Sequence, residues 1–181
     1  MEGLRGQLLV ASPALLDPNF HRTVVLVVEH GEAGALGVVL NRPSGAEVTE
    51  AAPLLAELVE PEGRVHSGGP VEPTAVMVLA ELEDPSEDAA MIFDGVGVLA
   101  ADADPPLWAA ETRRARVFAG YAGWGAGQLE SELAEEAWIV EPAEPGDVFG
   151  QAQDELWGDV LRRKGGQFAL LSRMPPDPSV N

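Results

Sequence analysis

Residues 118 to 130 read Phe118-Ala-Gly-Tyr-Ala-Gly-Trp-Gly-Ala-Gly-Gln-Leu-Glu130, and we call this segment the glycine joint. An apolar run ends within it and a helical pattern follows, so it is predicted to connect a strand to a helix. Glycine permits positive φ angles and a close approach of two backbones, while Tyr121 and Trp124 supply flat amphipathic side chains. These properties indicate a recognition surface at the joint.

Apolar runs elsewhere in the chain predict the fold class. Gly6–Ala11 and Thr23–Glu29 are rich in leucine and valine and predict strands that are buried on both faces. Ala35–Leu40 follows closely enough to form a hairpin with the second of them. Because strands occur in adjacent runs more often than in strict alternation with helices, we expect an α+β fold with a largely antiparallel or mixed sheet. A doubly wound fold is the weaker alternative, and residues 1–181 are expected to form a single domain.

The C-terminal part of the sequence predicts a helix followed by a strand. The helical pattern runs from Asp147, a candidate N-cap, to Lys164, and Gly165-Gly166 is expected to end it. Phe168–Leu171 is a short apolar run that predicts a final strand.

Composition and charge exclude several classes of function. The chain has 30 acidic and 11 basic side chains and a formal charge of −19, so its long-range field repels nucleic acid and anionic lipid. Two small basic clusters, at residues 113–116 and 162–164, are expected to have structural roles. The chain has no cysteine, which excludes disulfides and gives no support for an oxidising compartment. We therefore expect a cytoplasmic protein without direct contact to nucleic acid or membrane.

The histidines allow an enzymatic alternative. His21 or His66 could act with Asp17 or Glu29 in a hydrolase-type site, provided that a histidine and a carboxylate meet in one cleft. A metal site is not expected, because Asp17 and His21 would share an ion only within a helix and Pro18 favours a local turn. No cofactor is expected either.

Five blocks of sequence, taken together and in order, resemble the YqgE/AlgH family. The blocks are Gly6–Phe20, Thr23–His30, Gly37–Pro43, Gly68–Val71 and Gly120–Glu130, and they extend over nearly the whole chain. The resemblance implies a compact single-domain α+β fold with a bifurcated, coiled sheet, found in the bacterial cytoplasm. Members of the family carry the label of transcriptional regulators, but the resemblance implies neither a known reaction nor a DNA-binding motif.

Our first hypothesis is a non-enzymatic regulatory module that binds a small molecule or a protein, and the second is the hydrolase. In the first, Tyr121 and Trp124 offer a stacking surface, Arg22 or Arg42 binds a carboxylate or phosphate, and glycines present backbone N–H groups. Indirect regulation through another protein is a special case of it, and the oligomeric state is left open. The predicted ligand- or partner-binding residues are Pro13, Asp17, Phe20, Arg22, Asn41, Arg42, Pro43, Gly68, Gly69, Pro70, Gly120, Tyr121, Gly123, Trp124, Gly127 and Gln128.

Overall fold

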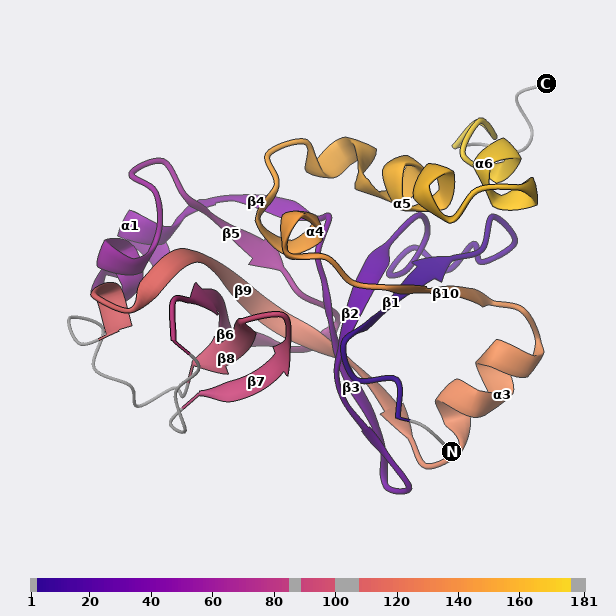
Figure 1. Cartoon of the computed structure of the whole chain (residues 1–181), viewed down its shortest axis with the longest axis horizontal. Coiled ribbons are helices and arrows are strands. Elements are labelled where there is room, and N and C mark those ends of the chain that lie inside the picture. The colour runs from indigo at the N-terminus through magenta and orange to yellow at the C-terminus, as the bar shows by residue number, and fades with distance from the viewer. Residues whose placement is uncertain (1–2, 85–88, 100–107, 177–181) are drawn as a thin grey trace.

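A computed structural model describes residues 3–84, 89–99 and 108–176, which form a ten-stranded sheet with helices packed around it (Figure 1). The strands are β1 (Gln7–Ala11), β2 (Val24–Gly31), β3 (Gly34–Val39), β4 (Pro43–Glu47), β5 (Arg64–Ser67), β6 (Val71–Leu82), β7 (Ala90–Phe93), β8 (Val96–Leu99), β9 (Thr112–Gly125) and β10 (Trp138–Pro142). The helices are α1 (Val48–Ala51), α3 (Gln128–Ala134), α4 (Pro145–Phe149), α5 (Leu156–Lys164) and α6 (Gln167–Leu171), with 3-10 helices η1 (Pro53–Leu58) and η2 (Gln153–Glu155). The predicted α+β class is confirmed.

Strand β9 is shared by the two halves of the sheet, which run in order β10-β1-β2-β3-β9-β6-β8-β7. One edge of β9 pairs with β6. The other edge pairs first with β5, at Phe118 and Ala119, and then with β3, over residues 122–125. Every pairing is antiparallel except that of β5 with β9. The sheet therefore forks at Gly120, which confirms the bifurcated sheet.

Close backbone contact at this fork requires glycine. A Cβ atom on Gly120, where φ is +79°, would lie 2.4 Å from the carbonyl oxygen of Gly69. A Cβ atom on Gly69 would lie 2.2 Å from the carbonyl carbon of Tyr121, and one on Gly68 would lie 2.3 Å from the carbonyl oxygen of Gly120. Real Cβ atoms do not approach backbone this closely, so three of the predicted binding glycines are needed for the packing of β5 and β9.

Strands β1 and β2 are buried on both faces, as predicted. Leu8 and Leu26 point into a cluster that α4 and α5 cover, whereas Leu9 and Val25 point into a second cluster beside α3. The predicted hairpin is confirmed, since β2 pairs antiparallel with β3 up to the Gly31–Gly34 turn. A third cluster lies between η1 and the β6–β8–β9 half of the sheet.

Both predictions for the C-terminal part are wrong in detail. The helix expected over 147–164 is interrupted, because Gly150 is extended and Arg116 donates hydrogen bonds to the carbonyls of Val148 (2.6 Å) and Gly150 (3.1 Å) where α4 ends. The strand expected at Phe168–Leu171 is helix α6, which packs against α5. A four-residue apolar run has no periodicity that separates a strand from one helical turn.

The basic residues at the end of α5 cover the edge strand β10. Lys164 Nζ donates to the carbonyl of Val140 (2.8 Å), and Arg163 donates to that of Pro142 (3.2 Å) while it pairs with the buried Asp147 (2.8 Å). These bonds satisfy carbonyls of a strand edge that another chain could otherwise pair with. The structural role expected for this cluster is confirmed. No helix in the described part of the chain has the length and apolar character that a membrane span requires.

Candidate functional site

Trp124, which was predicted to offer a stacking surface, is a core residue. It is 6% exposed, and its ring packs against Phe20 and Trp138 at centroid distances of 6.4 and 6.1 Å. Its indole N–H and that of Trp138 donate to the same carboxylate oxygen of Glu132, at 2.9 and 2.8 Å. The predicted stacking role of Trp124 is therefore wrong, since the ring is enclosed and its N–H has a partner.

The rest of the glycine joint mainly starts helix α3. Gly127 has a φ of +75° at the N-cap position. Gln128 accepts a hydrogen bond from the N–H of Gly125 (3.0 Å) and donates one to Glu132 (3.1 Å). Four predicted residues remain at least partly accessible nearby, on β9 and before β6: Gly69, Pro70, Tyr121 and Gly123.

Predicted ligand-binding residues near the loop between β1 and β2 instead hold that loop in place. Arg42 donates to two backbone carbonyls of the loop, at 3.0 and 2.9 Å, and Asn41 bonds to backbone groups at the start of β2. Arg22 lies over the ring of Trp157 at 4.3 Å, and Asp17 accepts a backbone N–H two residues further on (2.9 Å). Within the described structure these polar groups have protein partners, and Pro13 is partly exposed beside them.

The three histidines lie in separate environments. His21 contacts two backbone carbonyl oxygens, at 3.3 and 3.0 Å, and within residues 3–84, 89–99 and 108–176 neither it nor His66 hydrogen-bonds to a carboxylate. His30 does so: its Nδ1 accepts the N–H of Leu4 (3.0 Å), so its Nε2 carries the proton and donates to Glu130 (2.7 Å). Among the described residues, no three His, Cys, Asp or Glu side chains are grouped so that they could hold a metal ion.

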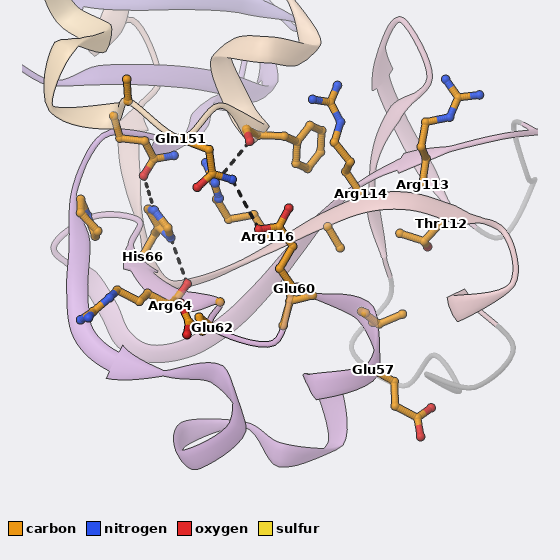
Figure 2. Close-up of a pocket in the computed structure, with 18 of the residues that line it drawn as sticks. Glu57, Glu60, Glu62, Arg64, His66, Thr112, Arg113, Arg114, Arg116 and Gln151 are labelled. Atoms are coloured by element: carbon orange, nitrogen blue, oxygen red, sulfur yellow. Dashed lines mark hydrogen bonds between the residues drawn. The ribbon is translucent and has the colours of Figure 1, made fainter.

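A cleft of about 550 Å³ lies between the start of β9, the segment from η1 to β5, and the segment from α4 to η2 (Figure 2). Four arginines line it, and we call it the arginine cleft: Arg64, Arg113, Arg114 and Arg116. Four acidic residues also line it: Glu57, Glu60, Glu62 and Asp154. Of the predicted binding residues, Pro43 lines this cleft, while the others lie at the fork, in the joint or around the β1–β2 loop.

The arginines of the cleft differ in how fully they are paired. Burial lowers the pKa of Arg116, and the charge of Arg114 adds to this effect while that of Glu60 opposes it. Arg114 pairs with Glu81 at 2.6 Å, whereas Arg113 is 4.0 Å from the same carboxylate and its side chain is 61% exposed. Arg116 thus has the structural role expected of its cluster, whereas Arg113 lies at the edge of the cleft, is mostly exposed and has a single weak ion pair in the described structure.

The floor of the cleft holds two buried polar side chains. His66 is 5% exposed and Gln153 is 7% exposed, and Nε2 of His66 hydrogen-bonds to Oε1 of Gln153. Nδ1 of His66 lies 3.1 Å from the carbonyl oxygen of Arg64. Burial, with a contribution from the charge of Arg116, lowers the pKa of His66, although both hydrogen bonds oppose this. The ring is therefore neutral near pH 7 and donates to only one of its two oxygen neighbours.

Two buried polar atoms in the cleft have no partner. In the described ranges, buried side-chain nitrogen and oxygen atoms without a hydrogen bond are Nε2 of Gln153 and Oγ1 of Thr112, and both residues line the arginine cleft. Buried polar groups in native proteins are nearly always hydrogen-bonded. Two exceptions in one cleft therefore make it the candidate functional site of the described structure.

Sequence reasoning missed most of this site. Gln153 and Thr112 carry no motif, and Arg64 stands alone in the sequence. Arg113, Arg114 and Arg116 were noticed only as a basic cluster with a structural role. The one usable signal was their spacing, because residues 114 and 116 of a strand share a face and so reach the same side of the sheet.

Comparisons with a family model, with related sequences and with solved structures all indicate the same family. The model of the AlgH-like family matches residues 8–169. A UPF0301 protein of Streptomyces avermitilis is 44% identical over 187 residues, which cover 100% of this chain and 97% of that protein. A crystal structure of a Corynebacterium diphtheriae protein matches with a TM-score of 0.88 and 29% identity, over 95% of this chain and 92% of that one. The solution structure of the AlgH protein from Pseudomonas aeruginosa matches with a TM-score of 0.72 and 32% identity, over 96% and 95%.

Proposed function

This chain belongs to the AlgH-like family, and we propose that it is a non-enzymatic regulatory module that binds a small molecule in the arginine cleft and does not bind DNA directly. The observation that carries the proposal is the amide nitrogen of Gln153, which is buried on the cleft floor without a partner in the described structure. An unpaired buried donor costs about 1–3 kcal/mol. A ligand that accepts its hydrogen bond removes this cost.

The size and form of the cleft also suit a small molecule. A volume of about 550 Å³ falls within the range of roughly 300–1,000 Å³ that is usual for ligand sites. Its walls come from three separate parts of the chain, so the walls are fixed by the fold rather than by a single loop. The polar groups converge on one space from different elements, which is typical of a site that orients its ligand.

Charge argues against nucleic acid as the ligand. The formal charge of the chain is −19, and the cleft is lined by as many acidic residues as arginines, four of each. Nucleic-acid binding requires several cations that neutralise successive phosphates. Regulation by this protein therefore acts through a small molecule or another protein, not through direct contact with DNA.

The histidines support a binding role over the hydrolase. A general base needs a free lone pair and, in most sites, a carboxylate that orients the ring. His66 has both ring nitrogens against oxygen atoms of the protein, and His30, the histidine that meets a carboxylate, has its Nδ1 lone pair occupied by the N–H of Leu4. In the described structure, neither His21 nor His66, the two histidines of the hydrolase hypothesis, has a carboxylate that would orient the ring as a general base.

The test is to isolate the full chain from its native cytoplasm, denature it, and identify the small molecules that it releases by mass spectrometry. Gln153→Leu removes the unpartnered amide, and Gln167→Leu changes an exposed glutamine elsewhere. We expect one compound to be enriched with the wild type and with Gln167→Leu but lost with Gln153→Leu. Identical small-molecule profiles from three folded proteins would contradict the proposal.

Folding of the Gln153→Leu protein can be checked independently. The substitution breaks the contact with His66 but also removes the unpaired amide, so the free energy of unfolding should change by no more than about 1 kcal/mol. A loss of the compound at nearly unchanged stability then reports binding and not unfolding.

A further inference from the structure

Strand β10 forms one edge of the sheet, and only half of that edge is covered. β1 pairs with one side of β10, and among the described strands none pairs with the other side. Lys164 and Arg163 donate to the carbonyls of Val140 and Pro142, so the second half of the strand is protected. Within the described residues, no such bond is made to the backbone of Trp138. The first half of β10 is therefore an open strand edge.

The direction of the backbone groups follows from the pairing of β10 with β1. The N–H of Ser12 donates to the carbonyl of Ala137 (2.9 Å), in the register of this pair of strands. Hydrogen-bonding residues alternate along an antiparallel strand, so the odd-numbered residues of β10 face β1 and the even-numbered residues face outward. Lys164, which reaches the carbonyl of Val140 from outside, agrees with this pattern. The N–H and C=O of Trp138 and the N–H of Val140 thus point to the open edge.

A groove of about 540 Å³ lies along this open edge. In Figure 1, α3 and α6 lie on opposite sides of β10. Trp138 and Val140 pack into the cluster beside α3, whereas Ile139 packs into the cluster that α5 covers. Apolar side chains of both α3 and α6 line the groove: Leu133, Phe168 and Leu171. A strand added at this edge would continue the sheet and would have a helix against each of its faces.

The backbone groups on the open edge match those of another peptide chain. They occur in the order donor, acceptor, donor, and the two donors are about 6.8 Å apart, which is the length of two residues in a strand. An extended peptide presents acceptor, donor and acceptor groups at the same spacing. Strand addition of this kind takes its affinity from main-chain hydrogen bonds and its specificity from alternate side chains. The groove therefore suits a short extended segment with apolar side chains toward both helices.

The charge of the groove favours a basic segment. Two charged residues line it, Lys164 and Glu136. Lys164 Nζ pairs with Glu141 at 3.3 Å, so its charge is balanced within the chain. Glu136 is exposed and forms no ion pair in the described ranges. The formal charge of −19 adds a long-range attraction for cations. A segment with Lys or Arg beside its apolar residues is complementary to this surface.

We propose that the open half of β10 binds an extended basic segment of another protein, which adds to the sheet as a further strand between α3 and α6. The backbone of the segment bonds to Trp138 and Val140, and its Lys or Arg side chain pairs with Glu136. This groove shares no lining residue with the arginine cleft, so the inference does not depend on the small molecule proposed there.

The experiment titrates the full chain with the blocked peptide acetyl-Lys-Val-Leu-Val-Lys-amide and follows backbone amide signals by NMR. The peptide reads the same in both directions, so either orientation brings a lysine to Glu136. We expect the N–H signals of Trp138 and Val140 to shift and to exchange more slowly with solvent. A peptide with all three apolar residues N-methylated should not bind. A peptide with Glu in place of both lysines should bind roughly tenfold more weakly.

Variants of the protein test the two kinds of contact. Val140→Pro removes an outward N–H but no bond to β1, and Pro142 already shows that β10 accepts proline at an outward position. It should weaken binding of the lysine peptide roughly tenfold. Glu136→Lys should weaken the lysine peptide and strengthen the glutamate peptide. Glu47→Lys, the same change at an exposed position of β4, should leave the preference for lysine unchanged. Amide signals away from β10 check that each variant is folded.

Four results would overturn this inference. Equal binding of the N-methylated peptide would mean that the groove holds an apolar group without strand pairing. Equal binding of the lysine and glutamate peptides to the wild type would contradict the basic class. Shifts of Trp138 and Val140 that grow with protein concentration before peptide is added would make a second copy of this chain the occupant. If the lysine peptide shifts neither signal, the edge is closed. The side-chain amide signals of Gln153 report on the arginine cleft separately.

Discussion

The glycine joint and the start of β9 belong to one continuous polypeptide segment, but they satisfy their polar groups in opposite ways. At the joint, the indole N–H groups of Trp124 and Trp138 both reach Glu132, and Gln128 bonds on both sides. At the arginine cleft, Thr112 and Gln153 each leave a buried polar atom without a partner in the described structure. The polar groups at the joint find their hydrogen-bond partners within the chain, whereas two polar atoms at the cleft do not.

This difference separates residues that are needed for folding from residues that are available for function. The glycines and aromatic residues of the joint are conspicuous in the sequence because the fork requires close backbone contact and a closed aromatic cluster. The cleft residues are inconspicuous because the ligand site that we propose there needs only a few polar groups that converge in space. A striking local motif therefore indicates a structural demand as readily as a binding surface.

The largest effect is expected at the fork. Gly120→Val places a Cβ 2.4 Å from the oxygen of Gly69 and forces a β-branched residue to a φ of +79°, so the free energy of unfolding should fall by more than about 4 kcal/mol. Gly45→Val is the control, since no atom lies within 4 Å of the added Cβ, and it should change stability by about 0.5 kcal/mol or less. Urea unfolding measures both, and a loss under about 1 kcal/mol for Gly120→Val would mean that the fork tolerates a side chain.

Trp124→Ala should give the next largest loss. Removing a ring that is 6% exposed leaves a cavity between Phe20 and Trp138, which typically costs about 3–5 kcal/mol. Tyr121→Ala, at a half-buried position three residues earlier, should cost clearly less. The comparison of the two unfolding curves decides whether Trp124 belongs to the core. If Trp124→Ala were as stable as the wild type, Trp124 would be a surface residue, as the sequence first indicated.

A smaller loss is expected for Glu132→Leu. The substitution leaves the N–H groups of Trp124 and Trp138 without an acceptor in a closed cluster, and each unpaired buried donor costs about 1–3 kcal/mol. Glu135→Leu, at an exposed position of the same helix end, should be nearly neutral. Urea unfolding measures the stability of both variants. Equal stability would show that solvent reaches the indole N–H groups of Trp124 and Trp138.

The smallest effect is a difference in pH dependence between the two regions. The pKa of His66 is lowered from its ordinary 6.5, so below pH 6.5 the unfolded state binds more protons than the native state. The free energy of unfolding therefore decreases as the pH is lowered. The pKa of Glu130 is lowered from 4.5 by hydrogen bonds from its own backbone N–H and from His30, so its contribution is lost only at more acid pH.

Unfolding in urea at a series of pH values tests this difference. His66→Gln should flatten the stability profile between about pH 6.5 and the lower native pKa of His66, whereas Glu130→Gln should change only the part of the profile below about 4.5. If the His66→Gln profile keeps the slope of the wild type below pH 6.5, His66 is not held neutral in the cleft.

Local patterns of the sequence predicted much of the fold. Strands β1 and β2, their burial on both faces, the β2–β3 hairpin and the strand-to-helix change at the joint followed from apolar runs and glycine positions. The interruption after α4 was missed because Arg116, which bonds to the carbonyls there, lies more than 30 residues away in the sequence. Helix α6 was missed because four apolar residues fit a strand as well as a turn of helix.

The binding residues were predicted where aromatic and glycine residues gather, and the structure assigns most of those side chains to internal contacts. Arg22 and Arg42 looked available because the carbonyls and the indole ring that engage them lie up to about 150 residues away. The sequence contains the donors, but it does not show which of them find acceptors within the chain. Pairing of that kind is decided by long-range contacts.

By itself, the sequence determined the family blocks, the α+β class and the net charge, because all three depend on residue identity and short-range periodicity. Only the tertiary structure decided which polar groups are satisfied. It brought Thr112, Arg64 and Gln153, from three distant segments, to the walls of one cleft and enclosed Trp124 beside Glu132. The physical reason is that a hydrogen bond between distant residues exists only where the whole fold fixes both partners at once.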